Sequence, residues 1–387
     1  MRILLFSDIS IPDSCALATR VMVFAKLLRQ LGHETELLGV SYRKEEALEG
    51  SFDGIPYRML RASSDTGLRA GRRVARLNKD IKTYLAQMPK FDTILLSNVY
   101  YDYAAAFLAY AKTHGAKLLV NQVEWYDRKD IRFGGITGKI NLLKNRIALR
   151  HLHVKMGNIL AISSLLDDYY KNRGCNTVTI PTIIDPAEYA AVASQPKAMD
   201  PVLKIAYAGS PARKDYIANA IRALPLLSKE ERKRIQFHFY GPQKEQLAVL
   251  GVGADFLETY KEQLVCHGRI PHCEVKEKIA QADFTVLLRP DKRYANAGFP
   301  TKVGESMACG TPVIANLTSD LGKYIIDGQT GILCADETPE SCAEAFRKAL
   351  ALTDAQRAAM HENCLEMTQK AFSYSAYQEA IEAFLHR

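Results

Sequence analysis

The 387-residue sequence lacks the long apolar runs and paired cysteines that mark membrane-spanning and disulfide-bonded proteins. Its Ala-rich stretch 101–111 is short and flanked by polar residues, far below the ~18 apolar residues that cross a bilayer. The opening apolar run, Ile3 to Phe6, is too short for the core of a signal peptide and is typical of a buried strand. The eight cysteines show no C-x-x-C spacing, so we expect buried, reduced thiols. These absences predict a cytoplasmic protein.

Several motifs of nucleotide and metal chemistry are also missing. No G-x-G-x-x-G follows the first strand, because residues 8–16 contain no glycine, and no Walker A sequence occurs. This argues against a dinucleotide-dependent dehydrogenase and a P-loop kinase. No D-x-D pair is present. A metal clip at Cys266–His267 and His272–Cys273 is an alternative, but neighbouring side chains on a strand point to opposite sides, so ordinary loop residues are favoured. We expect no metal cofactor.

The composition that is present, 48% apolar and 24% charged residues, is that of a soluble globular protein. At this length two domains are expected rather than one. Apolar strands alternate with helical stretches, which predicts an α/β fold of two Rossmann-like, doubly wound parallel-sheet domains. The expected strands are 3–6, 35–40, 93–97, 117–123 and 159–163 in the first half, and 204–208, 236–240, 284–288, 311–315 and 331–334 in the second.

The alternating pattern breaks near Pro181, and a polar stretch with no strong periodicity follows. We expect a first domain over 1–185, a linker over 186–203, a second domain over 204–372 and a C-terminal helical segment over 373–387 that packs back toward the first domain. Two such domains facing each other would form a cleft. In doubly wound sheets ligands bind at the carboxyl ends of the strands, so chemistry is expected in the loops that follow strands.

Basic residues are concentrated in the first half of the chain. Residues 1–190 hold 27 Lys and Arg against 19 Asp and Glu, whereas the remainder has 24 of each. The stretches 68–85 and 128–155 are amphipathic helical repeats rich in Arg. Clustered cations beside an apolar stripe attract anionic lipid headgroups or a lipid pyrophosphate. Nucleic acid would respond to the same field, but no nucleic-acid module accompanies it. We expect contact with a membrane surface and none with nucleic acid.

The most informative stretch is 294–316, which predicts a loop, a helix from about Thr301 to Cys309 and a buried strand. A helix whose first turn holds Thr301 and Lys302 presents free N–H groups, a positive dipole end and a cation, which together suit a diphosphate. Gly298 allows close backbone approach, and Glu305 can accept two hydroxyl hydrogen bonds from a ribose. The alternative is an amphipathic helix with Thr301 as N-cap and Glu305 solvated.

This stretch resembles the signature of retaining glycosyltransferase family 4, the group 1 glycosyltransferases. That signature begins with a Glu. After seven further residues it continues with Glu-x-x-x-x-Gly-x-Pro-Val-Ile. Glu305 and the residues 310–314 match the second part, and 299–302 resembles a Phe-Pro-Thr-Lys variant of bacterial polysaccharide-building members. The first Glu of the signature falls on Ala297, which departs from the usual contact to the donor sugar.

The resemblance implies further donor-site residues. Arg213 and Lys214 fall where the family places a basic pair that neutralises the donor pyrophosphate, the alternative being a helix start with solvated charges. The stretch 265–272, which contains Arg269, resembles the loop whose backbone contacts the base, and Asn296 or backbone amides can substitute for the missing carboxylate. The donor-binding residues implied are Asn296, Gly298, Phe299, Thr301, Lys302, Glu305 and Arg269.

In the first domain the family usually carries two adjacent glycines after the first strand, and this chain has none there. Arg20 nearby can pair with a phosphate or a carboxylate. Glu124, followed by the only tryptophan, Trp125, ends the expected strand 117–123. A carboxylate beside an aromatic ring is a plausible sugar-binding corner. Glu124 is therefore our acceptor-side candidate, the alternative being a salt bridge to nearby basic helices.

Taken as a member of this family, the chain has the two-domain fold called GT-B. It transfers a sugar from a nucleotide donor, such as a UDP- or GDP-sugar, to a glycan or lipid-linked acceptor with retention of configuration, in cell-surface polysaccharide synthesis. No metal is needed, because Arg213 and Lys214 stabilise the leaving group while Glu124 serves the acceptor. The protein would be peripheral on the cytoplasmic membrane face. A sugar-nucleotide epimerase or hydrolase and a non-catalytic nucleotide-sugar-binding scaffold are the alternatives.

Overall fold

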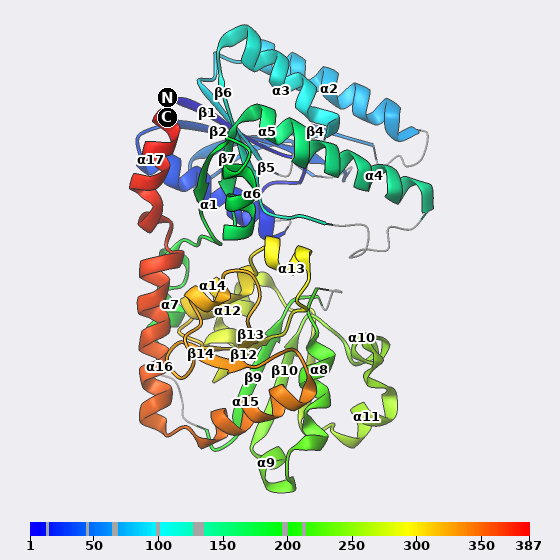
Figure 1. Cartoon of the computed structure of the whole chain (residues 1–387), viewed down its shortest axis with the longest axis vertical. Helices are drawn as coiled ribbons and strands as arrows, with labels where there is room; N and C mark the ends of the chain where they lie inside the picture. Colours follow the sequence, from blue (N-terminus) through cyan, green and yellow to red (C-terminus); the bar gives the residue numbers. More distant parts are fainter. Residues whose placement is uncertain are drawn as a thin grey trace. The chain divides into compact units, whose positions relative to one another are not determined.

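The computed structural model in Figure 1 describes residues 1–12, 15–43, 46–63, 69–97, 101–126, 135–195, 200–210 and 214–387. The chain divides into two compact units. The first domain is Met1–Ile183 with Tyr377–Arg387, and the second domain is Ile184–Ala376. The stretch 186–203, which we expected to be a linker, falls within the second domain in this division.

The first domain is built on an eight-stranded sheet of order β3-β4-β2-β1-β5-β6-β7-β8. Its strands are β1 (Arg2–Ser7), β2 (Glu34–Ser41), β3 (Glu49–Phe52), β4 (Ile55–Arg61), β5 (Thr93–Ser97), β6 (Lys117–Gln122), β7 (Asn158–Ala161) and β8 (Asn176–Thr179). All pair in parallel except β3, which forms an antiparallel hairpin with β4. The inner strands are buried over most of their length, as expected of a parallel sheet covered on both faces.

Helices follow the strands in the alternating order that the sequence predicts. In the first domain they are α1 (Ala16–Gln30), α2 (Arg69–Gln87), α3 (Tyr101–His114), α4 (Gly135–Ile147), α5 (His153–Met156) and α6 (Ser164–Lys171). α2 packs against α3, and α3 against α4 (Figure 1). The C-terminal helix α17 (Gln378–His386) also belongs to this domain, where the Lys117 ammonium donates to the carbonyls of Phe384 and Leu385 at 2.9 and 3.0 Å.

The second domain holds a six-stranded parallel sheet of order β11-β10-β9-β12-β13-β14. Its strands are β9 (Leu203–Ala208), β10 (Ile235–Tyr240), β11 (Leu264–Gly268), β12 (Phe284–Leu287), β13 (Val313–Asn316) and β14 (Gly331–Cys334). In chain order this is the 3-2-1-4-5-6 arrangement of dinucleotide-binding folds, so the strand order reverses between β9 and β12. Part of the stretch 265–272, expected to be a loop, is instead strand β11 and the start of α12.

The helices of the second domain include one short helix that precedes the sheet and several that connect its strands. They are α7 (Ala190–Ala193), α8 (Ile217–Arg222), α9 (Lys229–Lys233), α10 (Lys244–Leu247), α11 (Ala254–Thr259), α12 (His272–Ala280), α13 (Arg293–Ala297), α14 (Thr301–Ala308), α15 (Pro339–Ala351) and α16 (Asp354–Met367). Aromatic side chains of β10 and β12 fill the core, with Phe237, Phe239 and Phe284 fully buried.

Arg20 of α1 is a buried cation that fixes the end of the first domain's sheet. Its guanidinium donates to the carbonyls of Ile180 and Pro181, just after β8, and to Asn121 Oδ1 of β6 at 3.1 Å. Burial lowers its pKa to about 9. The described partners of Arg20 are therefore neutral oxygens and not the carboxylate that we had considered, and a contact to a phosphate stays a prediction.

We expect the substitution Arg20→Met to lower the free energy of unfolding of the first domain by about 3 kcal/mol. The reason is that it leaves three buried acceptors without a donor. Arg29→Met, at the exposed end of the same helix, should change it by less than about 0.5 kcal/mol. Urea unfolding of both variants measures this, and equal losses would show that the buried hydrogen bonds contribute nothing specific.

Candidate functional site

The carboxyl end of β9 is a place where the backbone of the second domain is packed without room for side chains. Gly209, the next residue, has φ +121°, and a Cβ placed on it would lie 3.1 Å from Cε of Lys302. Gly241, after β10, has the same φ, and its Cβ would lie 2.6 Å from the Gly209 carbonyl oxygen. Only glycine fits both constraints. The loop after β9 therefore lies directly under the Lys302 side chain, at the point where the strand order reverses.

Lys302, in the first turn of α14, is held by two residues of the β9 region. Its ammonium donates to Asp215 Oδ2 at 2.5 Å and to the Tyr207 hydroxyl at 3.0 Å. The Tyr207 hydroxyl donates in turn to the same Asp215 oxygen at 3.0 Å. The Lys302 side chain remains 30% exposed. A cation thus lies at this helix start, as predicted, and its ammonium forms an ion pair with one carboxylate.

The start of α14 is suited to an anion for a second reason. Pro300 is its N-cap and supplies no side-chain hydrogen bond to the first turn. The first backbone N–H groups of a helix have no partner within the helix, and its dipole is positive there. Thr301 is the first helical residue and not the N-cap that the alternative interpretation required. Gly298 has φ −88°, an ordinary extended conformation, so its role in close backbone approach stays a prediction.

Glu305 lies one turn further along α14 and is half-buried. Burial raises the pKa of Tyr189 well above its ordinary value, and the charge of Glu305 raises it further. The Glu305 carboxylate is therefore close to the Tyr189 ring, which comes from the segment before α7. That Glu305 binds a ribose stays a prediction, but it is not simply solvated.

The loop between α13 and α14 is braced by the residues that the resemblance assigned to the donor. Phe299 is buried against Tyr324 and Phe372, with ring centroids 5.4 and 6.0 Å away. Asn296 donates to Asp291 Oδ1 at 2.6 Å and accepts from the backbone N–H of Ser319 at 2.7 Å. These side chains hold the loop in place, and any contact they make to a ligand stays a prediction.

The remaining predicted donor residues lie at the ends of neighbouring strands. Lys214 follows the β9 loop and is half-buried, whereas Arg213 lies outside the described residues. Arg269 is exposed directly after β11. Ala297, where the family signature has a Glu, is fully buried.

Three residues in the region of this site escaped the sequence analysis. Tyr207 and Asp215 lie 95 and 87 positions from Lys302, and nothing in a single sequence links them to it. Arg289, after β12, is buried, and its Nη1 donates to the Ala295 carbonyl at 3.3 Å, which ties α13 to the sheet. The only signal for these positions was that each follows or ends a predicted strand.

The first domain has a cavity of about 460 Å³ at its own reversal of strand order, between β1 and β5. Its lining includes Asp8, Asp102, Tyr103, Glu124, Tyr126 and Lys144. Asp8 directly follows β1, whereas Asp102 and Tyr103 begin α3 after β5. The Lys144 ammonium pairs with Asp102 at 2.8 Å. The lining thus combines carboxylates, hydroxyls and a lysine, which suits a ligand with several hydroxyl groups.

Glu124 lines this cavity, and its acceptor-side role stays a prediction. Trp125 does not face it in the way we predicted. It is 9% exposed and packs edge-on against Tyr169, with centroids 4.4 Å apart. Tyr126 is the aromatic residue that lines the cavity. The large ring of Trp125 is packed in the core, and the next residue, Tyr126, lines the cavity in its place.

The metal clip considered at Cys266–His267 and His272–Cys273 includes His272, whose side chain lies outside the described residues. The His267 ring stacks on Tyr240, with centroids 4.6 Å apart, and accepts or donates a hydrogen bond with His238 at 3.0 Å. Among the described residues no group of three or more His, Cys, Asp or Glu side chains is arranged to hold a metal ion.

Asp8 is a carboxylate whose pKa is strongly perturbed by its surroundings. Burial raises its pKa to about 6, while hydrogen bonds with Tyr42 and Tyr103 and the charge of Arg73 oppose that rise. The Tyr42 hydroxyl donates to Asp8 Oδ1 at 2.7 Å. Because the folded pKa exceeds that of the unfolded chain, ionisation of Asp8 costs stability, and this cost appears as the pH rises through about 4 to 6.

We therefore expect Asp8→Asn to raise the free energy of unfolding of the first domain by about 2 kcal/mol at pH 8. The advantage should disappear near pH 4, where the carboxyl is protonated in both the folded and unfolded chain. Urea unfolding at pH 8, 6 and 4 measures it. Asp168→Asn, at an exposed position of α6, should show no such dependence, and a pH-independent effect of Asp8→Asn would contradict the burial argument.

Comparison with known proteins finds a family model that matches part of the chain. Residues 194–367 match the family model described as glycosyl transferases group 1. This range contains β9 to β14 and α14, and therefore the Lys302 site. A search of curated protein sequences finds no match.

Solved structures resemble the whole chain. Sucrose-phosphate synthase from Thermosynechococcus elongatus has a TM-score of 0.75 at 16% identity, covering 100% of this chain and 98% of that one. A trehalose-6-phosphate structure from E. coli bound with UDP-2-fluoro glucose has 0.74 at 12%, covering 100% and 99%. Anabaena HepE in complex with UDP and glucose has 0.67 at 13%, covering 100% and 99%. At these identities the likeness establishes the fold. The chain thus has the two-domain, Rossmann-like GT-B fold, and its residues 194–367 are similar to the group 1 glycosyl transferases.

Proposed function

We propose that the protein transfers a sugar from a nucleotide-sugar to a glycan or lipid-linked acceptor, with retention of anomeric configuration, in the synthesis of a cell-surface polysaccharide. The observation that carries the proposal is the start of α14, where Lys302 and uncapped backbone N–H groups lie beside Gly209 at the reversal of strand order. An anionic diphosphate fits such a place better than any neutral ligand.

In this mechanism the second domain stabilises the leaving group. Charge develops on the nucleoside diphosphate as the bond to the sugar breaks, and fixed positive groups there lower the barrier. Lys302, the dipole of α14 and the basic pair Arg213 and Lys214 supply that charge in place of a metal ion. Glu305 binds the ribose hydroxyls. UDP-sugars are the first donors to test, because fold relatives are named with UDP or UDP-2-fluoro glucose bound.

Donor binding must also change the Lys302 pairing. The ammonium is 2.5 Å from Asp215 Oδ2, so a diphosphate at the helix start competes with this carboxylate or shares the cation with it. Asp215 thereby lowers the affinity of the helix start for an anion. A substrate with additional contacts, such as a complete nucleotide-sugar, overcomes this cost more readily than free phosphate does.

The acceptor occupies the cavity of the first domain that Glu124 lines. Its carboxylates can accept hydrogen bonds from sugar hydroxyls and Lys144 can donate one. A hydrolase or epimerase with the same donor site would release nucleotide or invert a sugar centre without an acceptor, and a scaffold would bind the donor without turnover. An assay that follows the conversion of acceptor to product separates the transferase from a hydrolase or epimerase and from a scaffold.

We expect the full chain to transfer sugar from one member of a nucleotide-sugar panel to a glycolipid extract, with the donor's anomeric configuration retained in the product. Lys302→Met should lower kcat/KM about 100-fold, because a charge on the leaving group is lost. Lys214→Ala and Glu305→Ala should also lose most activity. Lys229→Met, an exposed lysine on α9, is the control and should retain it. Full activity in the first three variants would contradict the site, and nucleotide release without product would favour a hydrolase.

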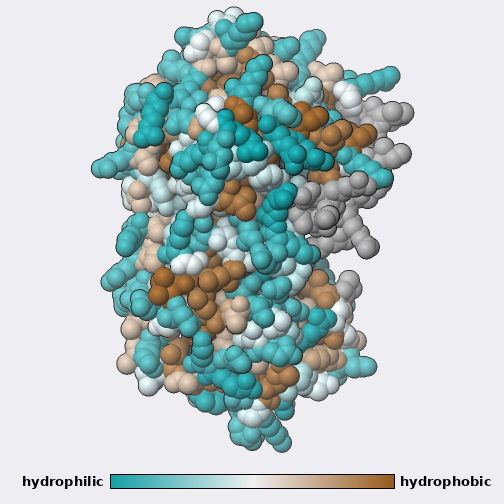
Figure 2. Space-filling view, in the orientation of Figure 1, coloured by the Kyte–Doolittle hydropathy of each residue, from teal (hydrophilic) through white to brown (hydrophobic). Residues whose placement is uncertain are grey.

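The exposed apolar residues of α4 support a contact with a membrane surface. Ile140 and Leu143 are 47% and 56% exposed and lie one turn apart, next to Lys139 and Arg146. On the face shown in Figure 2, apolar side chains of the first domain lie among hydrophilic ones. Within the described residues every helix is too short or too polar to cross a bilayer. Apolar side chains ringed by cations insert into the headgroup region of an anionic membrane.

We expect Ile140→Glu with Leu143→Glu to weaken binding to vesicles containing anionic phospholipid by about tenfold or more, because each side chain contributes apolar area to insertion. Sedimentation with vesicles measures this. Leu226→Glu, which alters an exposed leucine of the second domain, is the matched control. Equal binding of all three proteins would remove α4 from the proposed surface.

A further inference from the structure

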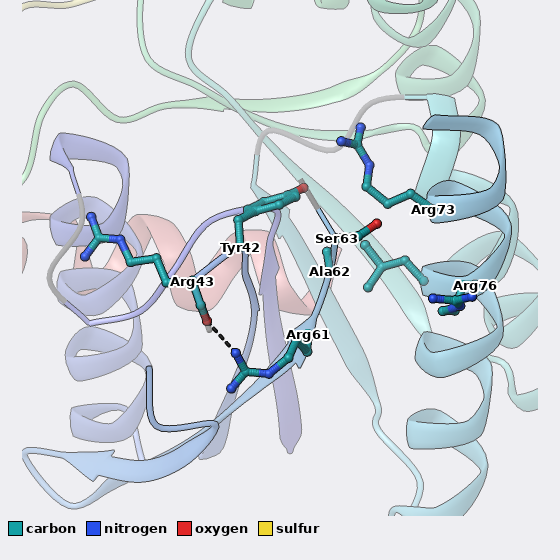
Figure 3. A pocket seen from close by; sticks show the side chains of 8 residues that line it. Tyr42, Arg43, Arg61, Ala62, Ser63, Arg73 and Arg76 are labelled. Carbon is teal, nitrogen blue, oxygen red and sulfur yellow. Dashed lines mark hydrogen bonds between the residues drawn. The ribbon is translucent and has the colours of Figure 1, made fainter. Parts of the chain in front are cut away.

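A second cavity, of about 330 Å³, lies beside the acceptor cavity in the first domain. It is bordered by the residues that follow β2 and β4 on one side and by α2 on the other, as Figure 3 shows. We call it the arginine pocket, because Arg43, Arg61, Arg73 and Arg76 line it. The described lining holds no carboxylate, and its other polar side chains are the hydroxyls of Tyr42 and Ser63.

Two described carboxylates beside residues of this pocket accept hydrogen bonds from hydroxyl groups. Asp8 accepts from the Tyr42 hydroxyl at 2.7 Å. Glu46 accepts from Ser10 and Ser41, at 2.8 and 2.5 Å. Four guanidinium groups around one cavity repel one another, and an anion that enters the cavity lowers this cost.

The four arginines form two groups: Arg61 and Arg73 contact neighbouring residues of the pocket, whereas Arg43 and Arg76 are exposed. Arg61 donates to the carbonyls of Arg43 and Glu46, at 2.5 and 3.1 Å, and so shapes the loop after β2 while keeping its charge. Figure 3 shows Arg73 extending from α2 toward Tyr42, whose ring centroid lies 5.8 Å from the guanidinium carbon. Arg43 and Arg76 are exposed and form no ion pair with another described residue. They are the members best able to turn toward a ligand.

We propose that the arginine pocket binds a phosphoryl group of the acceptor substrate. Guanidinium groups bind phosphate through paired N–H donors, and several around one cavity suit a group with two negative charges. A neutral sugar would need no such charge. Arg73 lines this pocket and also the acceptor cavity, so one acceptor can place its sugar hydroxyls beside Glu124 and its phosphoryl group among the arginines.

This inference rests on the proposed transferase function, because it names the class of acceptor. The phosphoryl group has two possible sources, a soluble sugar phosphate and a sugar linked to a lipid diphosphate. Both present the same chemistry to the pocket. They differ in that only the second brings an apolar chain.

The experiment measures binding of inorganic phosphate and of UDP to the full chain by calorimetry. Phosphate is titrated in the presence of saturating UDP, so that the second domain is occupied. The variant is Arg43→Gln with Arg76→Gln. The matched control is Arg72→Gln, an exposed arginine of α2 outside the pocket. We expect phosphate affinity to fall about tenfold or more in the double variant and to stay unchanged in the control, with UDP affinity the same in all three proteins.

Each outcome has a defined meaning. Equal phosphate affinity in the wild type and the double variant overturns the pocket assignment, and so does tighter binding of glucuronate than of hexose 6-phosphate. Failure of UDP to bind counts against the proposed function instead, since that site lies in the other domain. Stronger binding of a hexose 6-phosphate than of the hexose supports a soluble source, and a preference for a short-chain polyprenyl diphosphate hexose over both supports the lipid source. No preference for any phosphorylated compound contradicts the proposal.

Discussion

The close packing of backbone at the carboxyl end of β9 is the constraint on which the donor site depends. Gly209 and Gly241 leave no space for a Cβ, so the Lys302 chain lies across the loop and its ammonium reaches Tyr207 and Asp215. The start of α14 is thereby fixed against the reversal of strand order. A side chain at Gly209 would displace the cation before it altered any contact with a ligand.

The two domains apply one topological rule with different electrostatics. In each, the candidate site lies where the strand order reverses, between β1 and β5 and between β9 and β12. The first domain places carboxylates there, including a buried Asp8 with a raised pKa, and arginines further out along the strand ends. The second domain places a lysine and a helix dipole there. In the proposed function, hydroxyl recognition and charge stabilisation therefore fall to separate sheets.

Much of this was predictable from the sequence, because apolar runs and glycine stops are local signals. The strands β9, β12 and β13 and the helix α14 follow from such signals, and the resemblance around Glu305 agrees with the family that residues 194–367 match. The β3–β4 hairpin was not predicted, because β3 begins Glu49-Gly-Ser and carries no apolar run. The pairing of Lys302 with Asp215 could not be predicted, because it depends on how the segments that follow two strands meet. Trp125 was assigned to the wrong environment, because one residue at a strand end does not reveal which neighbour faces the core.

The assignment of Tyr377–Arg387 to the first domain has a consequence for how the two domains are connected. The polypeptide passes from the first domain to the second after Ile183 and returns after Ala376. Two backbone connections therefore join the domains. Cleavage of either connection leaves the domains attached through the other. Removing the final helix, by contrast, takes from Lys117 the carbonyls of Phe384 and Leu385, and so weakens the domain that begins the chain rather than the one that precedes the helix in sequence.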